Sequence, residues 1–185
     1  MIDVNNLRKG TTFEHDGELY KVLDYQHHKP GRGKATIRVG VVNLQTGTNR
    51  ELTFTSGDRV QDVSLDHHNV QYLYHDDRFY HFMDLETYEQ PVITADVLGD
   101  AAKYLKEGLQ VKLTFYQGEP LDIELPMTVD LEVTEAEMAV RGDTATGVTK
   151  KVVTETGLEV QVPNFIEAGT VIRVNTTDGS YITRV

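Results

Sequence analysis

The sequence contains no cysteine and no long apolar run. Without cysteine the chain cannot form disulfides, thiolate zinc sites, iron–sulfur clusters or a thiol nucleophile, so a reducing cytoplasm is the expected compartment. No segment approaches the ~18 uninterrupted apolar residues that span a bilayer. The N-terminus also lacks the basic and apolar regions of a signal peptide. We therefore expect a cytoplasmic protein that does not contact membranes.

Charge is distributed unevenly along the 185 residues, which carry 18 basic and 29 acidic side chains for a net charge of −11. That total argues against a general nucleic-acid coat protein. Residues 1–64 carry a net charge of +1, residues 65–127 carry −8 and residues 128–185 carry −4. No acid lies between Asp24 and Glu51, whereas this window holds five cations: Lys29, Arg32, Lys34, Arg38 and Arg50. This basic island on an acidic protein predicts one electropositive contact point.

Short runs rich in Val, Thr and Tyr alternate with polar residues and are separated by turn sequences, a pattern that predicts a mostly β protein. One helix is expected over residues 95–107, with Thr94 as its N-cap and Gly108 just beyond its end. Many short strands with one short helix favour small antiparallel barrels, and three barrels of about 60 residues fit the length. The expected strands are Leu19–His28, Ala35–Asn43, Arg50–Phe54, Val70–His75, Phe79–Met83, Leu109–Tyr116, Leu121–Leu125, Val129–Val133, Glu159–Val162 and Thr170–Asn175.

A basic loop lies between the first two of these expected strands. Pro30-Gly31 forces a turn, and Gly33 frees the backbone on the other side of Arg32. Arg32 is therefore expected at the tip of a hairpin with no acid close in sequence, where its planar donor group could reach phosphates. The alternative interpretation is an ordinary solvated hairpin tip.

The sequence shows no group of residues with the spacing of a catalytic or metal-binding site. Neighbouring histidines such as His67 and His68 point to opposite faces of a strand, so each pair offers at most one ligand to a side. None of the serines lies in a G-x-S-x-G elbow. We expect no metal, no cofactor and no enzymatic activity.

Four stretches in order give the chain a close resemblance to bacterial elongation factor P along its whole length. They are Lys29-Pro30-Gly31-Arg32-Gly33 with Ala35; Gln71-Tyr72-Leu73-Tyr74 followed by residues 82–90; Gly142-Asp143-Thr144 with Gly147 and Lys150; and Gly157-x-x-Val160-x-Val162-Pro163-x-x-Ile166-x-x-Gly169.

The resemblance implies an all-β chain of three small barrels in an L-shaped arrangement like that of tRNA. The first, residues 1–64, would be an SH3-like barrel of the KOW type. Residues 65–127 and 128–185 would each be an OB-fold.

The implied activity is that of a non-enzymatic translation factor. Members of the family bind both ribosomal subunits between the P and E sites and stimulate peptide-bond formation where consecutive prolines stall it. By motif position Arg32 is the tip that reaches the end of P-site peptidyl-tRNA, and the contacting loop also includes Lys29, Pro30, Gly31, Gly33 and Lys34. Some members carry a rhamnosylated arginine at this place, so Arg32 is a candidate modification site and a modifying enzyme a candidate partner.

The resemblance also assigns two sites to the C-terminal barrel. Gly142, Asp143 and Thr144 map onto a loop near the E-site codon of the mRNA. Tyr181 and Arg184 map onto the side near the small subunit. The factor is expected to act as a monomer.

Two other functions remain open from the residues alone. One is an oligonucleotide-binding module outside the ribosome, since OB-folds stack bases on aromatic side chains; the negative charge of residues 65–185 argues against it. The other is a hydrolase on an all-β scaffold, against which the missing nucleophile–base pair counts.

Overall fold

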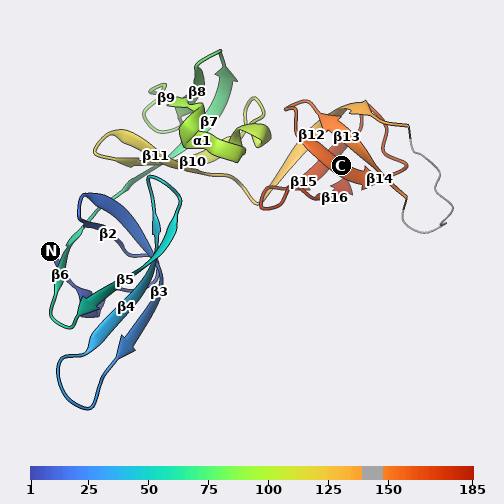
Figure 1. Ribbon diagram of the computed structural model, residues 1–185. Helices are drawn as coiled ribbons and strands as arrows, with labels where there is room; N and C mark the ends of the chain where they lie inside the picture. Colours follow the sequence, from blue (N-terminus) through green and yellow to red (C-terminus); the bar gives the residue numbers. More distant parts are fainter. Residues whose placement is uncertain (139–147) are drawn as a thin grey trace. The chain divides into compact units, whose positions relative to one another are not determined.

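The computed structural model describes residues 1–138 and 148–185, where nearly all regular structure is β (Figure 1). The described strands form one six-stranded and two five-stranded sheets. The chain separates into two compact units, Met1–Asp66 with Phe115–Leu121 and His67–Thr114 with Asp122–Val185. Over the described ranges, every helix is too short or too polar to cross a membrane.

The N-terminal sheet has the strand order β1-β6-β2-β3-β4-β5. Alternate residues of β4 are buried because side chains on a strand point to opposite faces, and Ile37, Val39 and Val41 are fully covered. They pack with Phe13 and Tyr20 in one apolar cluster. The elements are β1 (Ile2–Asp3), the 3-10 helix η1 (Val4–Asn6), β2 (Thr12–His15), β3 (Glu18–His28), β4 (Thr36–Asn43), β5 (Asn49–Thr55) and β6 (Arg59–Asp62).

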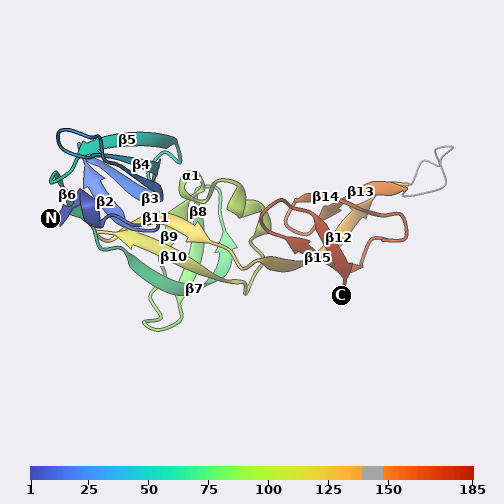
Figure 2. The same cartoon turned by 90° about the horizontal axis from the view of Figure 1, so that it is seen from below.

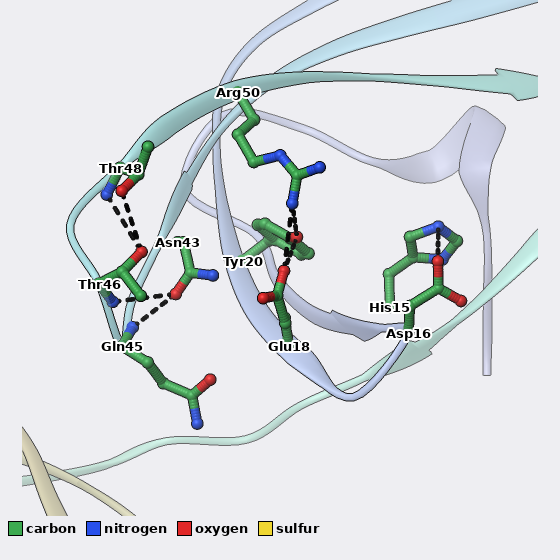
Figure 3. A network of polar contacts seen from close by, with 9 residues as sticks. All are labelled: His15, Asp16, Glu18, Tyr20, Asn43, Gln45, Thr46, Thr48 and Arg50. Atoms are coloured by element: carbon green, nitrogen blue, oxygen red, sulfur yellow. Dashed lines mark hydrogen bonds and ion pairs between the residues drawn. The ribbon is translucent and has the colours of Figure 1, made fainter.

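A polar network joins β3 to β5 across this sheet (Figure 3). Tyr20, almost completely buried, donates its hydroxyl to the Glu18 carboxylate, and Arg50 Nη1 lies 3.1 Å from the Tyr20 hydroxyl and 3.3 Å from Glu18 Oε2. The hydrogen bond to Glu18, helped by burial, raises the pKa of Tyr20. The one polar atom of this buried ring is therefore satisfied, and the network ties strands that do not pair directly.

The middle sheet has the order β11-β10-β7-β8-β9. Its core contains Val70, Tyr72, Phe82, Ile93 and Leu113, all buried. The strands are β7 (Asp66–His75), β8 (Phe79–Asp84), β9 (Val92–Thr94), β10 (Gln110–Tyr116) and β11 (Glu119–Glu124).

The helix expected over residues 95–107 is much shorter in the structure. The α-helix α1 covers Ala95–Leu98 and the 3-10 helix η2 covers Gly99–Tyr104. Gly99 adopts φ 53° and ψ −132°, which ends the α-helix after one turn. Thr94 does occupy the N-cap position, but its side chain makes no capping hydrogen bond.

The C-terminal sheet has the order β14-β13-β12-β15-β16, and the first four of these strands are labelled in Figure 2. Leu131, Val162 and Ile172 are completely buried in its apolar cluster, which also includes Tyr104 from η2. An ion pair with two hydrogen bonds, from Arg173 to Asp130, crosses β12 and β15, and the Arg173 hydrogen bond lowers the pKa of Asp130. The strands are β12 (Thr128–Ala136), β13 (Thr149–Thr154), β14 (Glu159–Pro163), β15 (Val171–Asn175) and β16 (Tyr181–Arg184).

Asp76 organises the turn between β7 and β8. Its Oδ1 accepts hydrogen bonds from the backbone N–H groups of Arg78 and Phe79 at 2.9 and 2.8 Å, and its Oδ2 lies 2.8 Å from His81 Nε2. The His81 contact, together with the two backbone bonds, lowers the pKa of Asp76 to about 2. The folded turn is therefore more stable when the Asp76 carboxylate is ionised.

This preference predicts a pH-dependent effect of Asp76→Asn. Because the folded pKa is below the ordinary value of 3.8, ionised Asp76 stabilises the fold above that value, and the contribution is lost as the pH falls towards 2. Asn keeps an acceptor for the two backbone bonds, so the substitution tests the charge. In urea unfolding, the stability deficit of the variant relative to the parent should shrink between about pH 5 and about pH 2. An equal deficit at both pH values would contradict this role.

Candidate functional site

The hairpin of β3 and β4 holds the basic loop. The two strands pair from Tyr20↔Asn43 to His28↔Thr36, with an irregularity between Val22 and Asp24. Beyond Val22, β3 contributes little to the core, and Tyr25 alone is half-buried in its distal part. The outer half of β3 is therefore mostly solvent-facing, whereas Ile37 and Val39 of β4, opposite His27 and Tyr25, still pack in the core and anchor the hairpin.

Residues 29–35 connect the two strands at the far end of this hairpin, with the chain bending at residues 31–33 (Figure 1). The base of the loop is held by a 2.8 Å hydrogen bond from the Ser56 N–H, just after β5, to the Ala35 carbonyl. Gly33 has φ +98°, a conformation that side-chain-bearing residues rarely adopt. Gly31 has no such positive φ, and space for a Cβ is open at both glycines.

Arg32 is exposed between these glycines, with Lys29 and Lys34 also exposed on the same loop. Over residues 1–138 and 148–185, none of the three side chains has a hydrogen bond or ion pair. The structure therefore brings together all the residues predicted for the tip: Lys29, Pro30, Gly31, Arg32, Gly33 and Lys34. Such a cation can approach a phosphate without first leaving an acidic partner.

The sites predicted on the C-terminal barrel are only partly visible. Gly142, Asp143 and Thr144 lie outside the described residues. Tyr181 and Arg184 lie at the two ends of β16, on a different sheet from the basic loop.

Arg184 has an aromatic neighbour that sequence reasoning did not identify. Its guanidinium carbon lies 5.7 Å from the centre of the Phe165 ring, which is 61% exposed. The residues are far apart in sequence and no periodic signal links them.

A second grouping that sequence reasoning missed is aromatic and lies on the β7–β8 hairpin. The rings of Tyr74 and His81 are stacked with centres 4.3 Å apart and planes 13° from parallel. The two residues are directly opposite each other in the strand pairing. Their alignment depends on a register irregularity between Tyr72 and Tyr74, which explains why simple alternation does not reveal it.

Comparison with protein families identifies three consecutive matches. The elongation factor P KOW-like domain matches residues 3–60, its OB domain matches residues 65–123 and its C-terminal domain matches residues 129–184. The chain belongs to the elongation factor P family. It is therefore a translation elongation factor, and the expected all-β fold of a KOW-type barrel followed by OB-folds is confirmed.

Solved structures support the same fold. Eukaryotic translation initiation factor 5A from Methanococcus jannaschii aligns with a TM-score of 0.57 at 23% identity, over 67% of this chain and 91% of that one. A translation initiation factor eif-5a family protein from Naegleria fowleri aligns with a TM-score of 0.53 at 15% identity, over 67% of this chain and 96% of that one.

The two loop glycines offer a matched test of the tip conformation. Both have open space for a methyl group, so they differ chiefly in φ. Gly33→Ala should cost about 1–2 kcal/mol in stability, or shift the backbone of residues 31–35 to relieve the strain, because its φ disfavours a Cβ. Gly31→Ala should change neither the stability nor the loop backbone. Thermal unfolding and amide chemical shifts would report both effects, and equal behaviour of the two variants would show that the φ of Gly33 does not hold the tip.

Proposed function

We propose that this factor binds the ribosome between the P and E sites and stimulates peptide-bond formation at consecutive prolines. Both subunits would be contacted, and Arg32 would hold the end of P-site peptidyl-tRNA. The observation that carries the proposal is an exposed arginine, without a partner among the described residues, at the end of a two-stranded arm. Membership of the elongation factor P family supports the ribosome as the partner.

The proposed mechanism is positional rather than chemical. Guanidinium groups bind phosphate oxygens through two parallel hydrogen bonds, and such contacts fix position without reading sequence. Holding the tRNA end near its reactive geometry lowers the entropic part of the barrier to the bond formed by the ribosome. The factor would therefore act as a monomer in the cytoplasm, without a catalytic residue, metal or cofactor of its own.

The remaining loop residues would shape and support the tip. Lys29 and Lys34 add positive charge near the phosphates, while Gly31 and Gly33 let the backbone approach closely. In the C-terminal barrel, Gly142, Asp143 and Thr144 would lie near the E-site codon of the mRNA, with Tyr181 and Arg184 towards the small subunit.

Removing the tip charge should abolish stimulation and leave the fold intact. Arg32→Ala should change stability by less than about 0.5 kcal/mol, because the side chain is exposed. In reconstituted translation of a message with a proline run, it should lose the stimulation that the parent gives. Arg59→Ala removes an exposed arginine from β6 of the same barrel and should stimulate normally. Full activity of Arg32→Ala would refute the assigned role of the tip.

We also propose that Arg32 is the target of a modifying enzyme. Its exposure and its position between two glycines make the guanidinium accessible to an enzyme active site. Intact-protein mass spectrometry of the factor from its native host should give a mass above that of the sequence, and Arg32→Lys should restore the sequence mass. An unmodified parent mass would contradict this second proposal while leaving the role of the charge in place.

A further inference from the structure

A groove of about 870 Å³ lies beside the β7–β8 hairpin and η2. Its size is within the range of small-molecule sites, roughly 300–1,000 Å³. No residue of the basic loop lines it, so it is separate from the site described above. Its lining includes three tyrosines, a histidine and two lysines: Tyr72, Tyr74, Tyr80, His75, Lys103 and Lys106.

Tyr74 supplies an exposed aromatic surface in this groove. It is 56% exposed, although large aromatic side chains usually bury more of their surface. His81 stacks on its ring and is itself held by Asp76 at 2.8 Å. Because His81 does not line the groove, it supports Tyr74 from behind and leaves ring surface available to a ligand.

A second stack fixes the rest of the aromatic wall. His75 and Tyr80 are 5.1 Å apart at 23°, and the Tyr72 hydroxyl lies 2.8 Å from His75 Nδ1. Burial, with a smaller contribution from Tyr80, raises the pKa of Tyr72 to about 12, so the hydroxyl stays protonated well into alkaline pH. These rings are therefore arranged before any ligand arrives, which reduces the entropy cost of binding.

The lysines place positive charge at the same groove. Lys106 Nζ donates a 3.2 Å hydrogen bond to the Asp130 carbonyl and forms an ion pair with Glu155 at 3.4 Å. Lys103 has no ion pair over residues 1–138 and 148–185. One lysine therefore shapes the wall, and the other has a charge available for a ligand.

We propose that this groove binds one unpaired nucleobase of RNA, stacked on Tyr74, with a phosphate near Lys103. Stacking on aromatic side chains beside a cation is how OB-folds hold single-stranded nucleic acid. The groove also adjoins the hairpin between the first two strands of the barrel, a loop that OB-folds use for ligands. This contact goes beyond the proposed role of Arg32 and belongs to a different domain.

The charge of the domain limits the site to a single base. Residues 65–127 carry a net charge of −8, and Glu107 and Glu155 also line the groove. A long strand would meet repulsion along its backbone, so free RNA should bind weakly and without cooperativity. The site would fill when the ribosome presents one unstacked base to it.

Titration of the ¹⁵N-labelled full chain with adenosine monophosphate tests the site without the ribosome. Amide shifts should move around Tyr74, Tyr80 and Lys103, with a Kd of about 1–10 mM. Ribose 5-phosphate is the control that keeps the phosphate and removes the base. It should cause less than a tenth of these shifts, and equal shifts would overturn stacking as the source of binding.

Matched variants assign the contact to its residues. Tyr74→Ala should weaken binding about tenfold and Tyr74→Phe should retain it, because only the first removes the ring. Tyr88→Ala removes a 71% exposed tyrosine of the same domain that does not line the groove, and should bind like the parent. Lys103→Gln should weaken binding severalfold and reduce its salt dependence. Equal affinity of the Tyr74→Ala and Tyr88→Ala variants would overturn the proposal. Arg32→Ala should leave nucleotide binding to the groove unchanged, whether or not the tip acts on tRNA.

Discussion

The pairing of β3 with β4 is the interaction on which the basic tip depends. Near the core the two strands are held by alternating buried side chains such as Val22 and Val41, which are opposite each other. After Val22 the register shifts, and Asp24 comes to face Gly40. A Cβ on Gly40 would lie 3.4 Å from that of Asp24, an ordinary van der Waals contact, so the two strands are closely packed at the irregularity. Such bulges bend a strand. Beyond this one β3 contributes no buried side chain, whereas Ile37 and Val39 of β4 remain in the core and anchor the hairpin that carries Arg32.

Much of this fold could be predicted from local pattern. Strong alternation in segments such as Thr36–Asn43 reflects one buried and one polar face, and this physical cause acts within the segment itself. The expected helix was wrong in length because its apolar spacing satisfied a helical period while Gly99 adopted a conformation that no α-helix contains. Strand β13 (Thr149–Thr154) was not predicted, because its two buried positions are Val152 and Thr154, so that its apolar and polar residues do not alternate as in a typical half-buried strand.

The candidate sites likewise include one that local sequence predicts and others that it does not. The exposed position of Arg32 follows from Pro30, Gly31 and Gly33, all within the loop, and could be expected from the sequence. The Tyr74–His81 stack and the Arg184–Phe165 contact depend on register and tertiary packing, and neither is encoded in adjacent residues. What the sequence alone could not provide was therefore the pairing of side chains between strands and loops.

The negative charge of the protein is partly a consequence of its turns. Asp76, Asp84 and Asp178 each accept hydrogen bonds at a turn, and these bonds lower their pKa values. Such carboxylates order the loops that connect short strands. A chain with many small hairpins therefore contains many aspartates that have a structural role. These acids also repel nucleic acid wherever no cation is placed. A mostly acidic protein with one basic loop therefore binds weakly along RNA in general. Its exposed cation is attracted most strongly where a preformed site presents phosphates to it.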